Sequence, residues 1–576
     1  MKFREQFGVM VNLVVRGINN INMEQKIKNW IKEILKIEGD FVLAHPKDIK
    51  NGDYAFFSSL ENEKEALEKL EKNKLAEIEK IEIAGKFINF FLSREFFSQS
   101  IEEILNEGNG YGKNELLSGK KIMVEYTDPN PFKPFHIGHL MTNAIGESIA
   151  RILEHSGALV ARANYQGDVG LHVAKAIYGL LDNEKLQNKA GSIALQAGNI
   201  GHAYSRGAEL YETDEKAKKE IDEINKKLYD KSDEKINEIY KWGFDVTMEA
   251  FEDLYKILGT KFDFYFLESA MTDIGKEIVQ ANIGKIFEKS DGAVIFKAEK
   301  FDPKLHTRVF ITSQGLPTYE TKELGLTKEK FKTEPNMDLS ITITANEQMD
   351  YMRVVAKALS IIHPDFENRM KHITHGMMRF VGGKMSSRKG NVITGESLMG
   401  DVHDMVLEKM TDRNFSPEEQ EKIANEVGVA AIKYSILKQS IGGDIIYDFE
   451  KSISFEGDSG PYLQYSYTRA NSVLEKAQKE NILPDFEKVP EEIFELEKLL
   501  YKFPEIVSRS ASLYEPHHIA NYLIEIARSF NSFYGNTVIV SKDDQYSSYK
   551  IALTYAFSFV TKTGLHLLGI EAPRKM

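Results

Sequence analysis

The chain has 576 residues, of which 42% are hydrophobic, and this length exceeds what one hydrophobic core supports, so several soluble domains are predicted. The absence of cysteine excludes disulfides and thiolate-bound zinc. The sequence contains no run of about eighteen uncharged apolar residues that would indicate a membrane segment, so a cytoplasmic protein is expected. The formal net charge of −13 does not favour RNA binding over the whole surface, because phosphate contacts draw on clustered lysine and arginine.

Residues 1–112 are predicted to form a first domain of α+β type. Met23 to Ile37 has the apolar spacing of a helix. Glu61 to Lys80 has the same spacing with many charges, which indicates a solvated amphipathic helix. Ile81 to Leu92 mixes alternation with an aromatic run and predicts a pair of strands, or a strand and a turn.

Residues 113–450 are predicted to form an α/β domain with a parallel sheet. Three apolar runs indicate strands, namely Lys121 to Tyr126, Ala158 to Ala163 and Leu339 to Thr344. A long helix from Ile137 to Ser156 follows the first run. Strands that alternate with helices are typical of a doubly wound, Rossmann-like sheet.

An insertion and a helical C-terminal domain complete the predicted organisation. The insertion covers about residues 183–300, because Asn183 to Tyr255 is nearly all helical and charged and Asp291 to Phe296 resembles a hairpin arm. Residues 451–576 have helical apolar spacing almost throughout and predict an all-α bundle.

The tract His136-Ile137-Gly138-His139 follows the first predicted strand and a proline-rich loop. A helix beginning at His136 offers free N–H groups and a positive dipole end, and imidazoles three residues apart lie on one face beside it. This arrangement suits the triphosphate of ATP, with the histidines donating hydrogen bonds as charge develops. The alternatives are a cap and a packing residue, or a zinc pair, although no third metal ligand is evident.

A second tract, Lys384-Met385-Ser386-Ser387-Arg388-Lys389-Gly390, follows two glycines. Its lysines could act as mobile charges on the β- and γ-phosphates, and its hydroxyls and backbone could donate hydrogen bonds. Taken alone, a solvated basic turn is the simpler interpretation. Both tracts in one chain, in this order and within an α/β pattern, favour an ATP site.

The pair of tracts resembles the signature of class I aminoacyl-tRNA synthetases, and the arginyl family most closely. The likeness covers nearly the whole chain, through Gly52 to Tyr54, Val124 to Asn130, Ala163 to Asp168, Gly460 to Tyr465 with Arg469, and Glu515 to Ala520. The family form of the second tract often has Ser387 and Arg388 before the second lysine. The resemblance thus implies a Rossmann-like catalytic domain with an N-terminal extra domain and an anticodon-binding bundle.

The resemblance also implies an arginine pocket. Its expected members are Glu125, Asn130, Tyr319, Glu323 and Gln348. Carboxylates and flat polar partners are the groups that a guanidinium with five fixed donors requires. Glu323 departs from the family, which commonly has aspartate at this position.

We predict that His136, His139, Lys384 and Lys389 are catalytic, and that Gly138, Met385, Ser386 and Ser387 also contact ATP. The expected reaction joins arginine to ATP as arginyl-adenylate and then transfers it to the terminal adenosine of tRNA-Arg. Mg²⁺ is expected to accompany ATP, and no protein metal ligand is predicted.

The resemblance implies RNA contacts in the C-terminal domain, where Tyr462, Gln464, Tyr465 and Arg469 are candidates for stacking on anticodon bases. Packing of helices is an equally good interpretation of each. The chain is expected to be a monomer. Two other functions stay open: a class I synthetase for lysine or another amino acid, and a tRNA-binding paralogue without catalysis.

Overall fold

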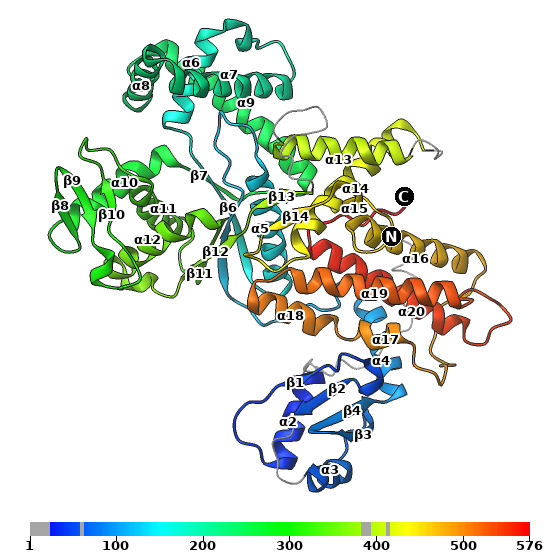
Figure 1. Ribbon diagram of the computed structural model, residues 1–576. Helices are drawn as coiled ribbons and strands as arrows, with labels where there is room; N and C mark the ends of the chain where they lie inside the picture. The colour runs from blue at the N-terminus through cyan, green and yellow to red at the C-terminus, as the bar shows by residue number, and fades with distance from the viewer. Residues whose placement is uncertain (1–22, 58–62, 382–392, 411–414) are drawn as a thin grey trace. The chain divides into compact units, whose positions relative to one another are not determined.

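The computed structural model describes residues 23–57, 63–381, 393–410 and 415–576 (Figure 1). The chain divides into two compact units, of which the first comprises Met1–Ser100 with Pro490–Tyr501 and the second comprises Ile101–Val489 with Lys502–Met576. Among the described residues, no helix has the length and apolar character that crossing a membrane requires.

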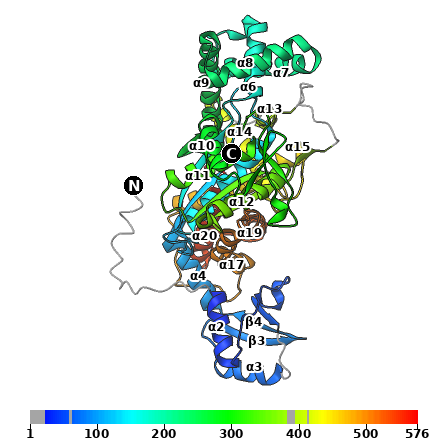
Figure 2. The ribbon, with the colours of Figure 1, turned by 90° about the vertical axis from the view of Figure 1, so that its left-hand side faces the viewer.

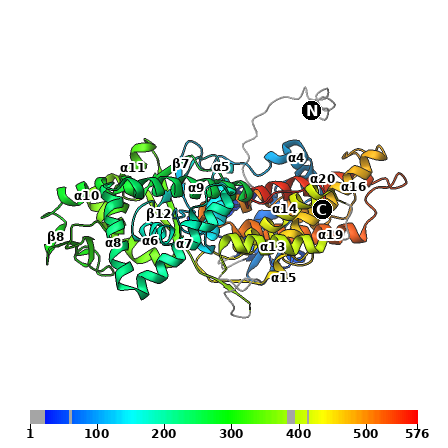
Figure 3. The same ribbon diagram turned by 90° about the horizontal axis from the view of Figure 1, so that it is seen from above.

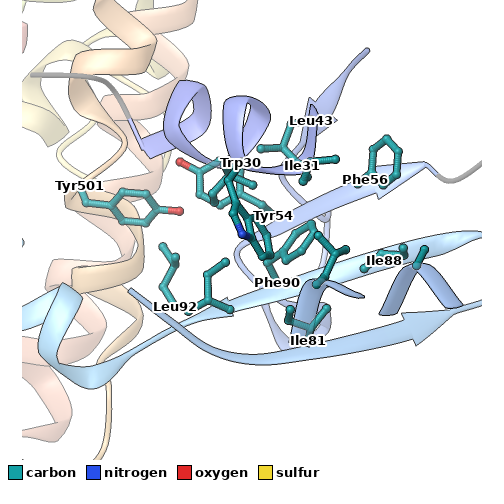
Figure 4. Packing of buried hydrophobic residues seen from close by; sticks show 14 of the residues in the cluster. Trp30, Ile31, Leu43, Tyr54, Phe56, Ile81, Ile88, Phe90, Leu92 and Tyr501 are labelled. Carbon is teal, nitrogen blue, oxygen red and sulfur yellow. The ribbon is translucent and has the colours of Figure 1, made fainter. Parts of the chain in front are cut away.

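The first unit contains a four-stranded antiparallel sheet with the order β1-β2-β4-β3. Its strands are β1 (Leu43–Ala44), β2 (Tyr54–Phe57), β3 (Ile78–Ala84) and β4 (Phe87–Leu92), and its helices include α2 (Met23–Leu35) and α3 (Glu63–Lys72) (Figure 2). Figure 4 shows Trp30 of α2 and Phe90 of β4 in the core, where their rings meet edge to face at 5.8 Å. Tyr501 closes one side of this core.

The predicted helix from Glu61 to Lys80 is too long. Helix α3 ends at Lys72, and Ile78 already belongs to β3, where it pairs with Leu92 and is buried. Strand pairing across the sheet outweighs the helical spacing of the local apolar residues. The predicted strand pair from Ile81 to Leu92 is confirmed, and its turn contains Gly85 with a φ of 62°.

The second unit is built on a parallel five-stranded sheet with the order β12-β11-β5-β6-β7. Its strands are β5 (Lys121–Glu125), β6 (Leu159–Gln166), β7 (Phe264–Leu267), β11 (Leu339–Ala345) and β12 (Met370–His375). The predicted α/β class and the three predicted strands are therefore confirmed. The strand order runs outward from β5 in both directions, and such a switch point opens a crevice at the carboxyl ends of the strands.

Helices follow the strands and fill the connections of this sheet. They are α5 (Ile137–His155), α6 (Leu171–Asp182), α7 (Ile193–Thr213), α8 (Glu215–Asp230), α9 (Glu234–Leu258), α10 (Glu268–Ala281), α11 (Tyr319–Thr333) and α12 (Met349–Ile362), whereas α4 (Arg94–Glu107) precedes β5 in the chain. Helices α6 to α9 come between β6 and β7 in the chain. They pack around a hydrophobic core of their own. After α10, the strands β8 (Phe287–Ser290), β9 (Ala293–Phe296) and β10 (Arg308–Ile311) form a small antiparallel sheet that contains the predicted hairpin arm.

The C-terminal third is mostly helical. Its elements are β13 (Met378–Phe380), α13 (Gly395–Met410), α14 (Pro417–Leu437), β14 (Ile445–Tyr447), α15 (Phe449–Ser452), α16 (Gly460–Lys479), α17 (Glu495–Leu500), α18 (Phe503–Leu513), α19 (His517–Asn536) and α20 (Ser547–Leu567). Helix α13 lies alongside α14 (Figure 3). The short parallel pair of β13 and β14 has no counterpart in the predicted elements, and α17 packs within the first unit.

Candidate active site

A cavity of about 390 Å³ lies at the carboxyl ends of the parallel strands. It is bordered by every predicted ATP or arginine residue that falls within the described ranges, namely Glu125, Asn130, His136, Gly138, His139, Tyr319, Glu323 and Gln348. The predicted residues Lys384, Met385, Ser386, Ser387 and Lys389 lie outside the described residues. The fold thus brings together side chains that are up to 223 positions apart in the chain, from Glu125 to Gln348.

Several strand ends deliver a residue to this cavity. Glu125 is the last residue of β5 and His375 the last of β12, while Gly167 follows β6 and Glu268 follows β7. Gln348 lies in the short 3₁₀ turn Asn346–Gln348 after β11 and accepts a hydrogen bond from the Tyr351 hydroxyl at 3.3 Å. This is the position at which open α/β sheets bind their ligands.

His136 and His139 form a reciprocal cap at the start of α5. The Nδ1 atom of His136 accepts the backbone N–H of His139 at 3.4 Å, and the Nδ1 atom of His139 accepts the backbone N–H of His136 at 3.2 Å. The two rings stack with their centroids 3.4 Å apart. The predicted helix start is therefore confirmed, and each imidazole has one nitrogen committed to the backbone.

The remaining ring nitrogens are hydrogen-bond donors. Desolvation and the nearby Lys133 ammonium lower the pKa of His136 to about 4, although its ring is exposed at the rim of the cavity. Desolvation, followed by the charges of His136 and Lys133, holds the pKa of the buried His139 well below its usual range. Both rings are thus neutral at pH 7, and because Nδ1 accepts, Nε2 carries the proton.

Gly138 leaves room for this stacked pair. A Cβ atom at position 138 would lie 3.0 Å from two atoms of the His136 ring, which is tighter than an ordinary contact. The glycine therefore leaves the space that the His136 imidazole occupies.

A cluster of carboxylates lies on the other side of the cavity. Glu125 is 2% exposed, and its Oε2 atom lies 2.5 Å from the buried Nζ of Lys330. The Oδ1 atom of Asp128 accepts the backbone N–H of Tyr165 at 2.7 Å. Glu323, from α11, is half-buried beside them. Three carboxylates facing one ammonium make this end of the cavity rich in acidic groups.

Burial and mutual repulsion raise the proton affinity of two of these carboxylates, Glu323 and Asp128. Desolvation and the charge of Glu125 raise the pKa of Glu323 to about 8, with further contributions from Glu268 and Glu320 that Lys330 only partly offsets. Desolvation and Glu125 likewise hold the pKa of Asp128 well above its usual range. A bound cation would relieve this repulsion, because an opposite charge favours the ionised carboxylates.

This shift predicts a pH dependence of arginine affinity. Below about pH 8 a cation must displace the proton of Glu323, so the affinity should rise on the order of tenfold between about pH 6.5 and 8.5 and then level off. The arginine KM at saturating ATP, measured across this range, tests the expectation. The ATP KM serves as the internal control, and a Glu323→Gln variant should lose most of the slope. A flat arginine KM in the unmodified chain would contradict the expected proton release.

Tyr319 and Asn130 border the same end of the cavity. Tyr319 begins α11 and is 67% exposed, with the Lys322 ammonium 5.4 Å from the centre of its ring. Asn130 depends on Gly167, because a Cβ atom at position 167 would lie 2.2 Å from the Asn130 Oδ1 atom. A larger residue at position 167 would therefore displace the amide.

Three family models match consecutive parts of the chain. "Arginyl tRNA synthetase N terminal domain" matches residues 22–92, "tRNA synthetases class I (R), catalytic domain" matches residues 100–449, and "DALR anticodon binding domain" matches residues 463–576. The chain belongs to the arginyl-tRNA synthetase family. The resemblance found in the sequence is thereby confirmed.

Individual members of this family agree with that assignment. An arginine–tRNA ligase from Clostridium perfringens is 32% identical over 519 residues, which cover 89% of this chain and 90% of that protein. One from Borrelia hermsii is 32% identical over 508 residues, covering 85% and 86%. The solved arginyl-tRNA synthetase of Thermus thermophilus has a TM-score of 0.79 at 22% identity, covering 96% of this chain and 100% of that one. The last match supports the predicted fold class.

The predicted RNA contacts of this synthetase-family chain lie on α16. Arg469 stacks between two rings, with its guanidinium carbon 4.7 Å from the centre of Tyr465 and 5.0 Å from that of Tyr534. Arg469 also donates to the Asn531 amide oxygen, and the amide nitrogen donates to the Tyr462 hydroxyl at 3.0 Å. We call these five residues the α16–α19 aromatic patch.

Gln464 does not belong to this patch. Its side chain is fully buried and donates hydrogen bonds to the carbonyls of Glu426 at 3.2 Å and Glu571 at 2.8 Å. The prediction that Gln464 contacts tRNA disagrees with this burial, because no surface of the residue is left for RNA. Its amide instead joins α16 to α14 and to the C-terminal tail.

Sequence reasoning missed several residues of the family's cavity. Lys133 borders the cavity three positions before His136, and its ammonium lies 5.4 Å from the centre of the Tyr204 ring. Its place in the sequence, close to His136, could have pointed to this lysine. Glu268, which pairs with Lys322, and Lys330, which lies behind the cavity wall, gave no comparable signal, because their neighbours come from distant parts of the chain.

Proposed function

We propose that this chain is an arginine–tRNA ligase that works in two steps. The carboxylate of arginine attacks the α-phosphorus of ATP, which gives arginyl-adenylate and releases pyrophosphate. A terminal adenosine hydroxyl of tRNA-Arg then attacks the activated carbonyl, and AMP leaves. The observation that carries the proposal is one cavity with an anion site at the start of α5 and a carboxylate cluster opposite to it.

The start of α5 would hold the phosphates of ATP. The Nε2–H groups of His136 and His139, together with the dipole of α5, would donate to phosphate oxygens as negative charge builds up. Lys133 would add a positive charge beside them. The predicted residues Lys384 and Lys389 would complete the charge compensation for pyrophosphate.

Mg²⁺ is proposed to arrive on the ATP phosphates. Among the described carboxylates of the cavity, Glu125 is paired with Lys330, and Asp128 accepts the Tyr165 N–H. These engaged groups fit a cationic substrate better than a divalent metal, which prefers several free oxygen ligands. The metal would therefore neutralise phosphate charge without a dedicated protein site.

The carboxylate cluster would hold arginine. Glu125 and Glu323 would accept the guanidinium N–H groups, and the exposed Tyr319 ring would cover the planar cation. Asn130 and Gln348 would orient the α-ammonium and α-carboxylate. No side chain needs to act as a nucleophile, because orientation and charge stabilisation supply the acceleration.

Each domain would have its own role in the charging of tRNA. Residues 1–112 are proposed to contact the tRNA outside the anticodon, residues 113–450 with the insertion at about 183–300 to carry out both reactions, and residues 451–576 to bind the anticodon. In the last domain the α16–α19 aromatic patch offers rings and a guanidinium for base stacking. We also propose a cytoplasmic monomer.

Replacement of Tyr465 by alanine tests the patch. One stacking platform is worth about 1–3 kcal/mol per base, so tRNA affinity should fall roughly tenfold or more while the arginine KM stays unchanged. Filter binding of tRNA measures the effect. Tyr555→Ala is the matched control, because Tyr555 is a half-buried tyrosine of α20 that stacks on Phe559. Equal tRNA binding by the two folded variants would remove Tyr465 from the proposed contact surface.

Charging of unfractionated tRNA with labelled arginine tests the function itself. Arginine should be incorporated only when ATP is present, and labelled lysine should not be incorporated. Incorporation of lysine would retain the ATP site and overturn the proposed pocket. A folded chain that binds tRNA-Arg but charges neither amino acid would be a non-catalytic paralogue.

A further inference from the structure

Lys330 is a buried lysine behind the wall of the cavity, and no step of the proposed reaction uses it. It lies two turns after Glu323 on α11 and is 3% exposed. Its Nζ atom is 2.5 Å from Glu125 Oε2 and 3.3 Å from the Thr342 hydroxyl. Glu125 and Thr342 are themselves partners in the register of β5 and β11. The lysine therefore reaches from a helix to the end of β5 and the middle of the adjacent β11.

The burial of the Lys330 ammonium has to be compensated by its neighbours. Isolated burial of an ammonium is costly, and it is tolerated when an opposite charge and further hydrogen bonds are present. Lys330 has both, through Glu125 and Thr342. By contrast, Lys332 on the same helix is mainly exposed and pairs with Glu329 on the surface.

We propose that Lys330 is a positioning residue for arginine recognition: its ammonium holds the buried Glu125 carboxylate in place, so that the cavity presents a preformed negative partner to the guanidinium. This inference rests on the proposed function. Lys330 itself does not border the cavity and would position the substrate through Glu125, which does.

The balance of charge around Lys330 supports this role. The titratable groups that face it are Glu125 from β5, Asp128 from the following loop, Glu323 from α11 and His372 from β12. Without the ammonium, Asp128 and Glu323 would lose a nearby positive charge, so their pKa values would rise further.

The same contact also fixes geometry. The ammonium holds the buried Oε2 side of the Glu125 carboxylate, which leaves Oε1 to accept from the guanidinium in a charge-assisted hydrogen bond. A preset orientation saves the ordering of this side chain when arginine binds.

Lys330→Met tests the inference, because methionine keeps most of the apolar stem and removes the charge. The arginine kcat/KM should fall by roughly tenfold to a hundredfold, in line with breaking a buried ion pair, whereas the ATP KM should not change. The pH at which arginine kcat/KM declines on the acid side should move upward. Lys330→Arg should restore much of the loss, and Lys332→Met is the matched surface control.

A double-mutant cycle with Glu125→Gln separates positioning from simple stability. If Lys330 acts through Glu125, adding Lys330→Met to Glu125→Gln should cost less than about threefold further in arginine kcat/KM. The double variant also removes both buried charges, so it keeps the test available if Lys330→Met alone does not fold.

The outcomes are distinct. A folded Lys330→Met variant with unchanged arginine kcat/KM and pH profile would overturn the inference, and so would fully additive losses in the cycle. Failure of the unmodified chain to charge arginine would instead overturn the proposed function, since that reaction is measured first in the same assay.

Discussion

Glu125→Gln is expected to lower the arginine kcat/KM by about a thousandfold while leaving the ATP KM within about twofold. The change removes the negative charge that lies deepest in the cavity and leaves the Lys330 ammonium buried without its partner. An uncompensated ammonium next to an incoming guanidinium would repel the substrate as well as destabilise the empty site. The loss should therefore exceed that of one neutral hydrogen bond.

Steady-state charging of tRNA with varied arginine measures this loss. Glu329→Gln is the matched control, because Glu329 is a half-buried glutamate that is also paired with a lysine on α11 but lies outside the cavity. Thermal unfolding of both variants shows whether the fold is retained. A tenfold or smaller loss in a folded Glu125→Gln variant would mean that arginine is held mainly elsewhere.

His139→Ala is expected to reduce the rate of arginine activation by about a hundredfold to a thousandfold. The alanine removes the Nε2–H donor, and it also removes the Nδ1 acceptor that caps the His136 backbone N–H at 3.2 Å. Loss of the stacked partner would free the His136 ring, which lies only 3.4 Å away. One substitution should therefore disturb both predicted donors.

Arginine-dependent exchange of pyrophosphate into ATP, with tRNA present, isolates this step. His363→Ala serves as the control, since His363 is a half-buried histidine that contacts Phe366 and does not border the cavity. Binding of tRNA should be equal in all variants. Full exchange activity in His139→Ala would exclude the start of α5 from the chemistry.

The sheet and the start of α5 could be predicted because their signals are local. Lys121 to Tyr126 is an apolar run that ends at a proline-rich loop, and β5 covers residues Lys121–Glu125. The two histidines were expected at a helix start, and they form the cap of α5. In both cases the residues that decide the structure are adjacent in sequence.

Other features depend on partners that are far away in the chain. The helical spacing that continues to Ile78 is overridden by its pairing with Leu92, and the burial of Gln464 depends on carbonyls in α14 and the C-terminal tail. Lys330 is one of several lysines on α11, and only the fold shows that it meets Glu125. Periodicity within a segment carries no information on such contacts.

The resemblance to the arginyl family supplied what local patterns could not. It placed Tyr319, Glu323 and Gln348 beside Glu125, and all four border one cavity in the structure. Glu323 reaches this position although the family commonly has aspartate there. Its raised pKa of about 8 is a consequence of crowding that the motif alone did not suggest.

The most direct test of the central claim compares charging of tRNA-Arg with arginine and with citrulline. Citrulline keeps the shape of arginine but replaces the cation with a neutral group whose carbonyl oxygen would face the carboxylates. A site built for the charge and the five donors of arginine should prefer it by roughly ten-thousandfold in kcat/KM. A preference below about tenfold would contradict the claim that the carboxylate cluster around Glu125 selects the substrate.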